Sequence, residues 1–413
     1  MNPNRVFRPL IIFFCLNVFW IDSSAQSTCY EFDEELFNQF SITDTVYASN
    51  QERFDGSFTD LSVRIWNATE NDCQTKPLLL CIHGGGFIAG DPTLMDSVCQ
   101  AFASRGYLAA SIQYRMGWFG EGYCSADTSE AIRAWYRAIE DCQNATFFFK
   151  NNSQLFGIDS SLIFLCGWSA GGYTAAGAAF LDQENEKPDA CSSIDSIMNA
   201  TNQTFSRPDL GNLPGFYRDP SYKGIITFSS SMLFPDLLSL GNNEPVLAFN
   251  NENDPYLVPV NTSRAWWNID NCEEFYPISC GWTSEQVNQF QIQELVQQYV
   301  YQENTCPHNL HHPCFPHWNE EIELMSNFMQ EKMSAITNLN ETESLNEHVT
   351  KALVCKTMDE VHSVLPNNDS WKLYSSNGKL IFSGFMKPAV LDSGCYYLQI
   401  EESKISTLIC FIP

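Results

Sequence analysis

A serine flanked by glycines carries the clearest signal for chemistry in this chain. Residues 167–171 read Gly-Trp-Ser-Ala-Gly, which places Ser169 at the centre of a G-x-S-x-G pattern. The apolar run Leu162–Cys166 before it predicts a buried strand, and the Ala/Gly-rich run 170–181 after it predicts a closely packed helix. A serine on a sharp turn between strand and helix exposes its hydroxyl and can act as a nucleophile. The pattern alone also fits an ordinary Gly/Ser turn.

Three glycines at another strand end could stabilise a negatively charged oxygen. The apolar run Pro77–Ile82 is followed by His-Gly-Gly-Gly at 83–86. Without Cβ atoms, the backbone N–H groups of these glycines can approach an oxyanion closely. A triple glycine also fits a flexible turn or a phosphate site, but the lysine and Ser/Thr of a P-loop are missing here. Together with a serine motif about 80 residues further along the chain, the glycines favour acyl transfer.

A nucleophilic serine needs a base, and a carboxylate that orients this base. The strand predicted at 245–249 leads into a turn, 250–255, which contains two carboxylates. We expect Asp254 to be the orienting acid, and Glu252 is the second choice. The alternative for Asp254 is a purely structural role in an Asp-Pro turn.

Four histidines precede the last predicted helix, and each of them is a candidate base: His308, His311, His312 and His317. Together with Cys306 and Cys314 they could instead bind a metal ion. Their spacing matches no compact zinc pattern, and the two cysteines are better explained as a disulfide. We therefore expect neither a metal nor a cofactor.

The elements that must position these residues alternate between apolar strands and helices, after an antiparallel lead-in within 26–76. Strands are predicted at 77–82, 107–114, 162–166, 224–228, 245–249 and 298–301, and helices at 92–104, 129–146 and 318–333. This alternation predicts an α/β fold with a mostly parallel sheet covered by helices on both faces. Active sites in such sheets lie outside the carboxyl ends of the strands, which is where the glycines and Ser169 fall.

Ile82–Phe87 and residues 167–172 resemble the α/β-hydrolase carboxylesterases and lipases that carry a His-Gly-Gly-Gly oxyanion motif. The pair Tyr114-Arg115 resembles the strand-end Tyr-Arg of the same group. The likeness covers roughly residues 60–335. It implies an α/β-hydrolase fold for this part of the chain.

The resemblance also implies roles for the site residues. The oxyanion donors would be the backbone N–H groups of Gly85, Gly86 and Ala170. Asp254 resembles the acid of the family, whose triad follows the chain order Ser, Asp, His. His311, in the sequence His-His-Pro, looks most like the His-x-Pro of secreted relatives, so we expect it to be the base.

The expected activity is that of a serine carboxylic-ester hydrolase that works through an acyl-enzyme. Its substrate would be a small-molecule or a polymeric ester, and no residue identifies the acid or the alcohol. The alternative is a catalytically inactive binding or adhesion protein on the same fold, because a fold alone does not fix a function.

The N-terminal residues and the cysteine content predict a protein outside the cytoplasm, and the net charge argues against nucleic-acid binding. A formal charge of −27 with only 22 Lys and Arg argues against nucleic-acid binding. Residues 1–25 have the basic start, the short apolar run and the small-residue end of a signal peptide, so we expect a secreted or cell-surface protein. Sixteen cysteines fit an oxidising compartment. Three pairs are close enough to close small loops: Cys124/Cys142, Cys272/Cys280 and Cys306/Cys314.

The C-terminal residues form a module of their own. We expect the α/β-hydrolase domain to cover 26–336, a polar linker to cover 337–350, and a small all-β module to cover 351–413. Asn377-Gly378 between two apolar runs predicts a hairpin in this module. The module resembles the C-terminal sorting domain of the type IX secretion system of Bacteroidota, which implies the secretion machinery as a partner. The alternative is an accessory β-sandwich that binds a partner or a carbohydrate.

Overall fold

The structure, a computed structural model, consists of two compact units, Met1–Gln330 and Glu331–Pro413. It describes residues 32–71, 73, 75–118, 128–198, 202–230, 244–256, 295–345, 349–355, 371–375, 380–384, 394–400 and 406–411. The predicted signal peptide, 1–25, and the Cys272/Cys280 pair lie outside these residues. None of the helices in the described segments is long and apolar enough to cross a membrane.

The first unit is built on one eight-stranded sheet with the order β1-β2-β4-β3-β5-β8-β9-β10. Its strands are β1 Phe40–Glu52, β2 Phe58–Ala68, β3 Lys76–Ile82, β4 Leu108–Ile112, β5 Ile158–Trp168, β8 Gly224–Phe228, β9 Val246–Asn251 and β10 Val296–Tyr301. The strand β2 is antiparallel to both β1 and β4, and every other pair is parallel. This topology confirms the mostly parallel α/β sheet and the antiparallel lead-in.

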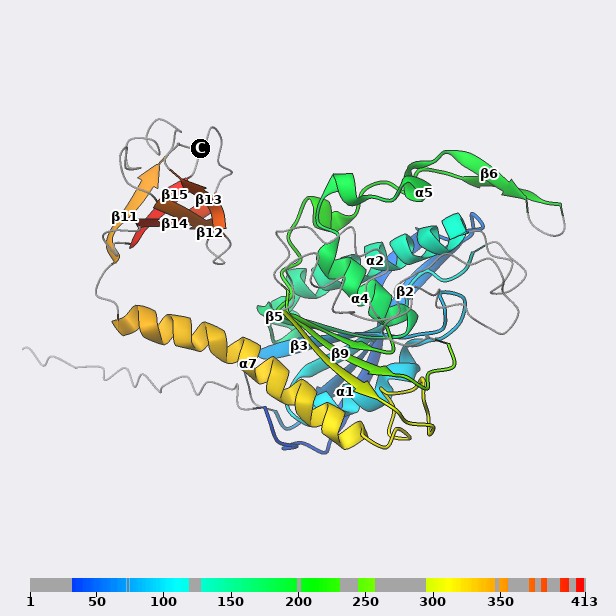
Figure 1. Ribbon diagram of the computed structural model, residues 1–413, viewed down its shortest axis with the longest axis horizontal. Helices are drawn as coiled ribbons and strands as arrows, with labels where there is room; N and C mark the ends of the chain where they lie inside the picture. Colours follow the sequence, from blue (N-terminus) through cyan, green and yellow to red (C-terminus); the bar gives the residue numbers. More distant parts are fainter. Residues whose placement is uncertain are drawn as a thin grey trace, which may run out of the picture. The chain divides into compact units, whose positions relative to one another are not determined.

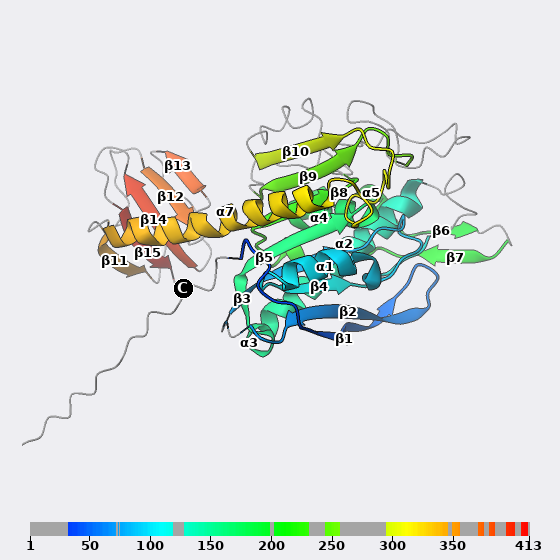
Figure 2. The same cartoon turned by 90° about the horizontal axis from the view of Figure 1, so that it is seen from below.

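Helices cover both faces of this sheet, as the alternating pattern predicted. They are α1 Asp96–Ala103, α2 Thr128–Asn151, α3 Ser153–Phe156, α4 Ala170–Phe180, α5 Asp189–Ser192 and α7 Trp318–Leu345, with short 3₁₀ turns at Pro92–Met95, Glu184–Glu186 and Pro214–Phe216. Figures 1 and 2 show α2 and α4 on one face, and α1 with the first part of α7 on the other. All residues of β3 and of α4 are buried, because β3 is a central strand with helices on both sides and α4 packs between the sheet and α2.

Residues 183–222, which lack clear periodicity, form an excursion between α4 and β8. Besides two of the 3₁₀ turns and α5, it contains an antiparallel hairpin of β6 Asp195–Met198 and β7 Thr204–Arg207. In Figure 2 this hairpin extends from the body of the unit. Its burial is low on both strands, so it contributes little to the core.

The described cysteines of the first unit include buried free thiols and disulfide-bonded residues. Cys306 and Cys314 are disulfide-bonded across a sequence separation of 8 residues, as expected. Cys81 and Cys166 are free and lie side by side on the neighbouring strands β3 and β5. The expected pairing of Cys142 with Cys124 is wrong, because Cys142 is a free thiol buried on the inner face of α2.

An unpaired acidic side chain is buried on α7, and it makes the stability of the first unit depend on pH. Glu321 is 0% exposed, and neither of its carboxyl oxygens has a hydrogen-bond partner among the described residues. Burial, with a smaller contribution from Glu320, raises its pKa from 4.5 to about 10. Between these values the folded chain holds a proton that the unfolded chain has lost, so stability falls as the pH rises.

We therefore expect Glu321→Gln, which keeps the shape and removes the ionisation, to stabilise the protein at pH 8. The gain should be on the order of 2 kcal/mol there and should vanish near pH 4, where both states are protonated. Thermal unfolding of both proteins at the two pH values measures it. A gain of equal size at pH 4 and pH 8 would contradict the buried-carboxyl explanation.

The second unit begins within α7 and continues as a five-stranded sheet of order β11-β15-β14-β12-β13. Its strands are β11 Val349–Cys355, β12 Trp371–Ser375, β13 Leu380–Gly384, β14 Gly394–Ile400 and β15 Ser406–Phe411. Strands β12 and β13 pair antiparallel on either side of Asn377-Gly378, as expected of the hairpin. The expected linker at 337–350 is partly wrong, because α7 continues through it as far as Leu345.

Candidate active site

Ser169 lies on the sharp turn that joins β5 to α4. Its backbone has φ 53° and ψ −122°, a conformation that is strained for a residue with a side chain. Two sets of hydrogen bonds hold it there. The Ser169 N–H donates to the carbonyl of Phe228 on β8 (2.8 Å), and the Ser169 carbonyl accepts from the N–H of Gly172 (2.9 Å). These hydrogen bonds hold the strained turn in place, and a turn of this kind is typical of a nucleophilic serine.

The glycines on either side of Ser169 are required by space. A Cβ atom on Gly167 would lie 2.2 Å from the carbonyl oxygen of Gly171. A Cβ atom on Gly171 would lie 2.0 Å from the carbonyl oxygen of Ile82, at the end of β3. Both obstacles are backbone atoms that have no freedom to move aside. The G-x-S-x-G pattern thus reflects the close packing of α4 against the ends of β3 and β5.

A histidine bridges Ser169 and Asp254, and this histidine is His308. The His308 Nε2 atom lies 3.1 Å from Ser169 Oγ, and its Nδ1 atom lies 2.7 Å from Asp254 Oδ2. Asp254 stands in the turn after β9, where its second oxygen accepts a hydrogen bond from the N–H of Tyr256 (2.8 Å). The side chains of Asp254 and His308 are only 1% and 13% exposed. This is the geometry of a serine, a base and an orienting acid.

The expectation that His311 is the base is wrong. His311 is buried, and its ring stacks on the Trp168 indole with 4.0 Å between centroids. Burial, together with the nearby rings of His308 and His312, lowers its pKa to about 3, so it stays neutral. The sequence offers no signal for the difference, because the disulfide loop encloses His308 and His311 alike.

The remaining candidates lie at the surface with other partners. His312 is exposed and its Nδ1 accepts from the N–H of Cys314 (3.1 Å). His317 lies between Glu320 (2.9 Å) and Glu303 (3.2 Å). Glu252, the second choice for the acid, accepts a hydrogen bond from Gln302 (2.7 Å) and does not contact a histidine in the described part of the chain.

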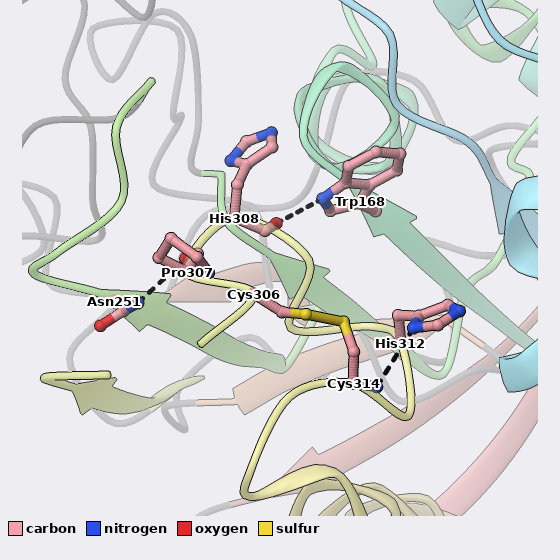
Figure 3. The surroundings of a disulfide bond; sticks show 7 residues. All are labelled: Trp168, Asn251, Cys306, Pro307, His308, His312 and Cys314. Carbon is pink, nitrogen blue, oxygen red and sulfur yellow. Dashed lines mark hydrogen bonds between the residues drawn. A yellow bond between two sulfur atoms is a disulfide. The ribbon is translucent and has the colours of Figure 1, made fainter. Parts of the chain in front are cut away.

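The loop that carries His308 is fixed at its backbone by residues that sequence reasoning did not select. The His308 carbonyl accepts from Trp168 Nε1 (2.7 Å) and from Ser229 Oγ (3.1 Å). The Asn251 side-chain amide donates to the carbonyl of Pro307 (3.0 Å). Figure 3 shows Trp168, Asn251, Pro307 and His308 around the disulfide, with the Trp168 indole N–H pointing at the His308 carbonyl. Strands β5, β8 and β9 thus all position the histidine.

The disulfide closes the same loop and bears on the metal alternative. Cys306 and Cys314 bond to each other, so they are not available as thiolate ligands. Within the described ranges, no group of three or more His, Cys, Asp or Glu side chains is arranged to hold a metal ion.

The glycine loop after β3 begins against the residue that precedes Ser169, because a Cβ atom on Gly84 would lie 2.6 Å from the Trp168 indole. Gly85 and Gly86 have φ values of 118° and 60°, and the next residue, Phe87, has 62°. Among the described residues, no acceptor pairs with the N–H of Gly85, Gly86 or Ala170. Unpaired backbone N–H groups can stabilise an oxyanion where they lie beside a nucleophilic hydroxyl.

His83, at the start of this loop, supports the backbone and has no place in proton transfer. Its ring stacks on Tyr114 with 4.5 Å between centroids, and the Tyr114 hydroxyl donates to the His83 carbonyl (3.1 Å). Burial lowers the His83 pKa to about 4, so the ring is neutral at neutral pH. Of the pair Tyr114-Arg115, Tyr114 thus supports the start of the glycine loop, whereas Arg115 is bound to Asp141 and Glu140.

Comparison with known proteins finds a family match over a segment that contains the glycine loop and Ser169. Residues 65–208 match the family described as BD-FAE. The chain is 35% identical over 100 residues to gut esterase 1 of Caenorhabditis elegans, which is 24% of this chain and 17% of that protein. It is 31% identical over 124 residues to esterase LipI of Mycobacterium tuberculosis, which is 30% of this chain and 35% of that protein. The chain thus spans about a third or less of the length of these relatives.

Solved structures with similar chain traces include esterase 2 of Thermogutta terrifontis. That structure is 15% identical, covers 70% of this chain and 94% of its own, and superposes with a TM-score of 0.43. The segment 65–208 includes the glycine loop and Ser169. Asp254 and His308 lie beyond it.

Proposed function

We propose, from the esterase-like segment 65–208 and the bridging position of His308, that this protein is a serine carboxylic-ester hydrolase. The observation that carries the proposal is the pair of contacts that His308 makes, at 3.1 Å to Ser169 Oγ and at 2.7 Å to Asp254 Oδ2. A binding protein on this fold would have no need for both contacts. The substrates are small-molecule or polymeric esters.

In the first half of the reaction Ser169 Oγ attacks the ester carbonyl carbon while His308 Nε2 takes the hydroxyl proton. Asp254 accepts the Nδ1–H of His308, which fixes the tautomer and stabilises the imidazolium. The amides of Gly85, Gly86 and Ala170 bind the oxyanion of the tetrahedral intermediate. When this intermediate collapses, His308 gives the proton to the leaving alcohol, and an acyl-Ser169 remains.

In the second half a water molecule takes the place of the alcohol. His308 removes a proton from the water, whose oxygen attacks the acyl carbon, and the same amides bind the second oxyanion. The collapse returns the proton to Ser169 Oγ and releases the carboxylic acid. Neither half requires a metal or a cofactor.

Covalent labelling tests the proposal directly. A fluorophosphonate probe should label the wild-type protein with one equivalent, and peptide mapping should place the label on Ser169, because the activated Oγ attacks phosphorus as it attacks a carbonyl. Short-chain p-nitrophenyl esters should be hydrolysed by the same preparation. A folded protein that is neither labelled nor active would favour the binding or adhesion alternative.

We further propose that the protein is exported, and that the C-terminal module serves export and not chemistry. The signal-peptide pattern at 1–25 and the resemblance of 351–413 to a sorting domain support this. All proposed catalytic residues belong to the first unit, and the module has a separate sheet. A folded unit with its own sheet can carry an address for secretion without affecting the active site.

Truncation after Leu345, which keeps the whole of α7, separates the two roles. The truncated protein should hydrolyse p-nitrophenyl esters at a rate within about twofold of the full chain, because no proposed catalytic group is removed. In the native host it should remain inside the cell while the full chain leaves it. A truncated protein that is insoluble or inactive would show instead that the module is required for folding of the first unit.

A further inference from the structure

A cavity of about 430 Å³ lies between the β1–β2 turn, the first half of α2 and the segment that follows β7. None of Ser169, Asp254 and His308 lines it. Its lining is unusual for such an acidic protein, because it contains five arginines: Arg53, Arg115, Arg133, Arg137 and Arg207. Some of these arginines form ion pairs with carboxylates, and others do not.

Two of the arginines are fully paired with carboxylates. Arg115 contacts Asp141 at 2.8 Å and Glu140 at 2.5 Å. Arg207 contacts Asp195 at 2.5 Å and Glu130 at 3.2 Å. The buried carboxylates around the cavity are therefore already in use. The other acidic residues of the lining are exposed: Glu52, Asp55 and Asp209.

Within the described residues, neither Arg133 nor Arg137 forms an ion pair with a carboxylate, although Glu130 is near enough to offset part of the pKa lowering that burial causes in both. They are 2% and 4% exposed and stand four residues apart, so they share one face of α2. Among the described residues, Arg133 donates to the carbonyls of Ala190 (2.8 Å) and Pro208 (2.5 Å), and Arg137 to the carbonyl of Gly117 (2.9 Å). No carboxylate of the described residues lies within 4 Å of either guanidinium group. Most N–H donors of the two guanidinium groups are thus available to hydrogen-bond a ligand.

Such an arrangement is costly in a protein with a surplus of acidic residues. A buried cation without a counter-charge destabilises a fold, and burial indeed lowers the pKa of Arg137 to about 10. The chain has 49 Asp and Glu against 22 Lys and Arg, so a partner carboxylate would be easy to supply. Among the described residues no carboxylate beside the open cavity pairs with Arg133 or Arg137, and a bound anion would supply the counter-charge there.

We propose that this cavity binds a small oxyanion of two negative charges, a dicarboxylate or a phosphate, between Arg133 and Arg137. Two planar guanidinium groups on one helix face match the paired oxygens of either anion, and each can donate two parallel hydrogen bonds. A volume of about 430 Å³ is in the range of ligand sites and admits such an anion together with the molecule that bears it. The site is separate from the proposed esterase chemistry and does not depend on it.

Binding is tested on the full chain with malonate and inorganic phosphate as probes, against KCl at equal ionic strength. We expect at least one of the two anions to raise the melting temperature in a saturable way that KCl does not reproduce. Titration calorimetry should give a stoichiometry near one. Saturation by malonate alone would point to a carboxylate ligand, and saturation by phosphate alone to a phosphorylated one. A response equal to that of KCl for both anions would overturn the proposal.

Substitutions of the two arginines test whether the anion binds in this cavity. Arg133→Gln and Arg137→Gln should each weaken the affinity for the anion about tenfold or more, because each removes one guanidinium group. Arg105→Gln removes the same charge from the surface after α1, which does not line the cavity, and should bind as the wild type does. If Arg137→Gln fails to fold, Arg133→Lys serves instead. It keeps the positive charge without the planar guanidinium group and should bind the anion more weakly than the wild type. Unchanged affinity in the two cavity variants would overturn the proposal.

Discussion

Ser169→Ala should lower kcat for p-nitrophenyl esters by about 10⁴-fold or more, because it removes the only atom placed to form the acyl-enzyme. The substitution takes away one oxygen and leaves the turn intact, since the backbone hydrogen bonds to Phe228 and Gly172 do not involve the side chain. Initial rates across a range of substrate concentrations measure the effect. Fluorophosphonate labelling should be lost together with turnover.

A matched serine separates this effect from general damage. Ser161, at the exposed beginning of the same strand, binds only Asp159 through its hydroxyl, and Ser161→Ala should keep the wild-type kcat. Thermal unfolding should show that Ser169→Ala is at least as stable as the wild type, because its strained turn is retained. Equal ester turnover by Ser169→Ala and the wild type would remove Ser169 as the nucleophile.

Replacement of the bridging histidine should be about as damaging as loss of the serine. His308→Ala removes the proposed base, which links Asp254 to Ser169, so kcat should again fall by about 10⁴-fold or more. Residual activity would come from the oxyanion amides and from substrate binding. Rates measured in parallel for the neighbouring histidines decide which of them is the base.

The controls for this prediction are the two histidines three and four positions further along. His311→Gln keeps a polar side chain at the buried position, and His312→Ala alters an exposed one. Both should retain kcat within about tenfold, and His311→Gln should lower the melting temperature through its lost stacking on Trp168. A collapse of kcat in His311→Gln at unchanged stability, with an active His308→Ala, would restore His311 as the base.

The parts of this site that are local in sequence could be predicted, because local patterns determine them. Ser169 and the glycines around it form one turn whose close packing needs those residue types. Asp254 follows directly from an apolar strand. The parallel sheet could be predicted for the same reason, since each strand is a short apolar run bounded by turn residues.

The base could not be predicted, because its position depends on contacts between distant segments. His308 faces Ser169 because Trp168, Ser229 and Asn251 hold its loop from three different strands. No pattern within the loop distinguishes it from His311. The end of α7 was missed for a different reason: its last turns consist of polar residues, which are as common in a linker as in an exposed helix.

The hydrogen bonds that hold the His308 carbonyl have a consequence for folding. Ser169 and His308 are 139 residues apart, and the indole and the hydroxyl that fix the loop come from β5 and the end of β8. Contacts between such distant segments form late, after the loops between them have closed. A partly folded chain that has assembled β3, β4, β5 and β8 would already present the strained serine, but without a base to activate it. The nucleophile would therefore stay inert until the last strands of the sheet have paired.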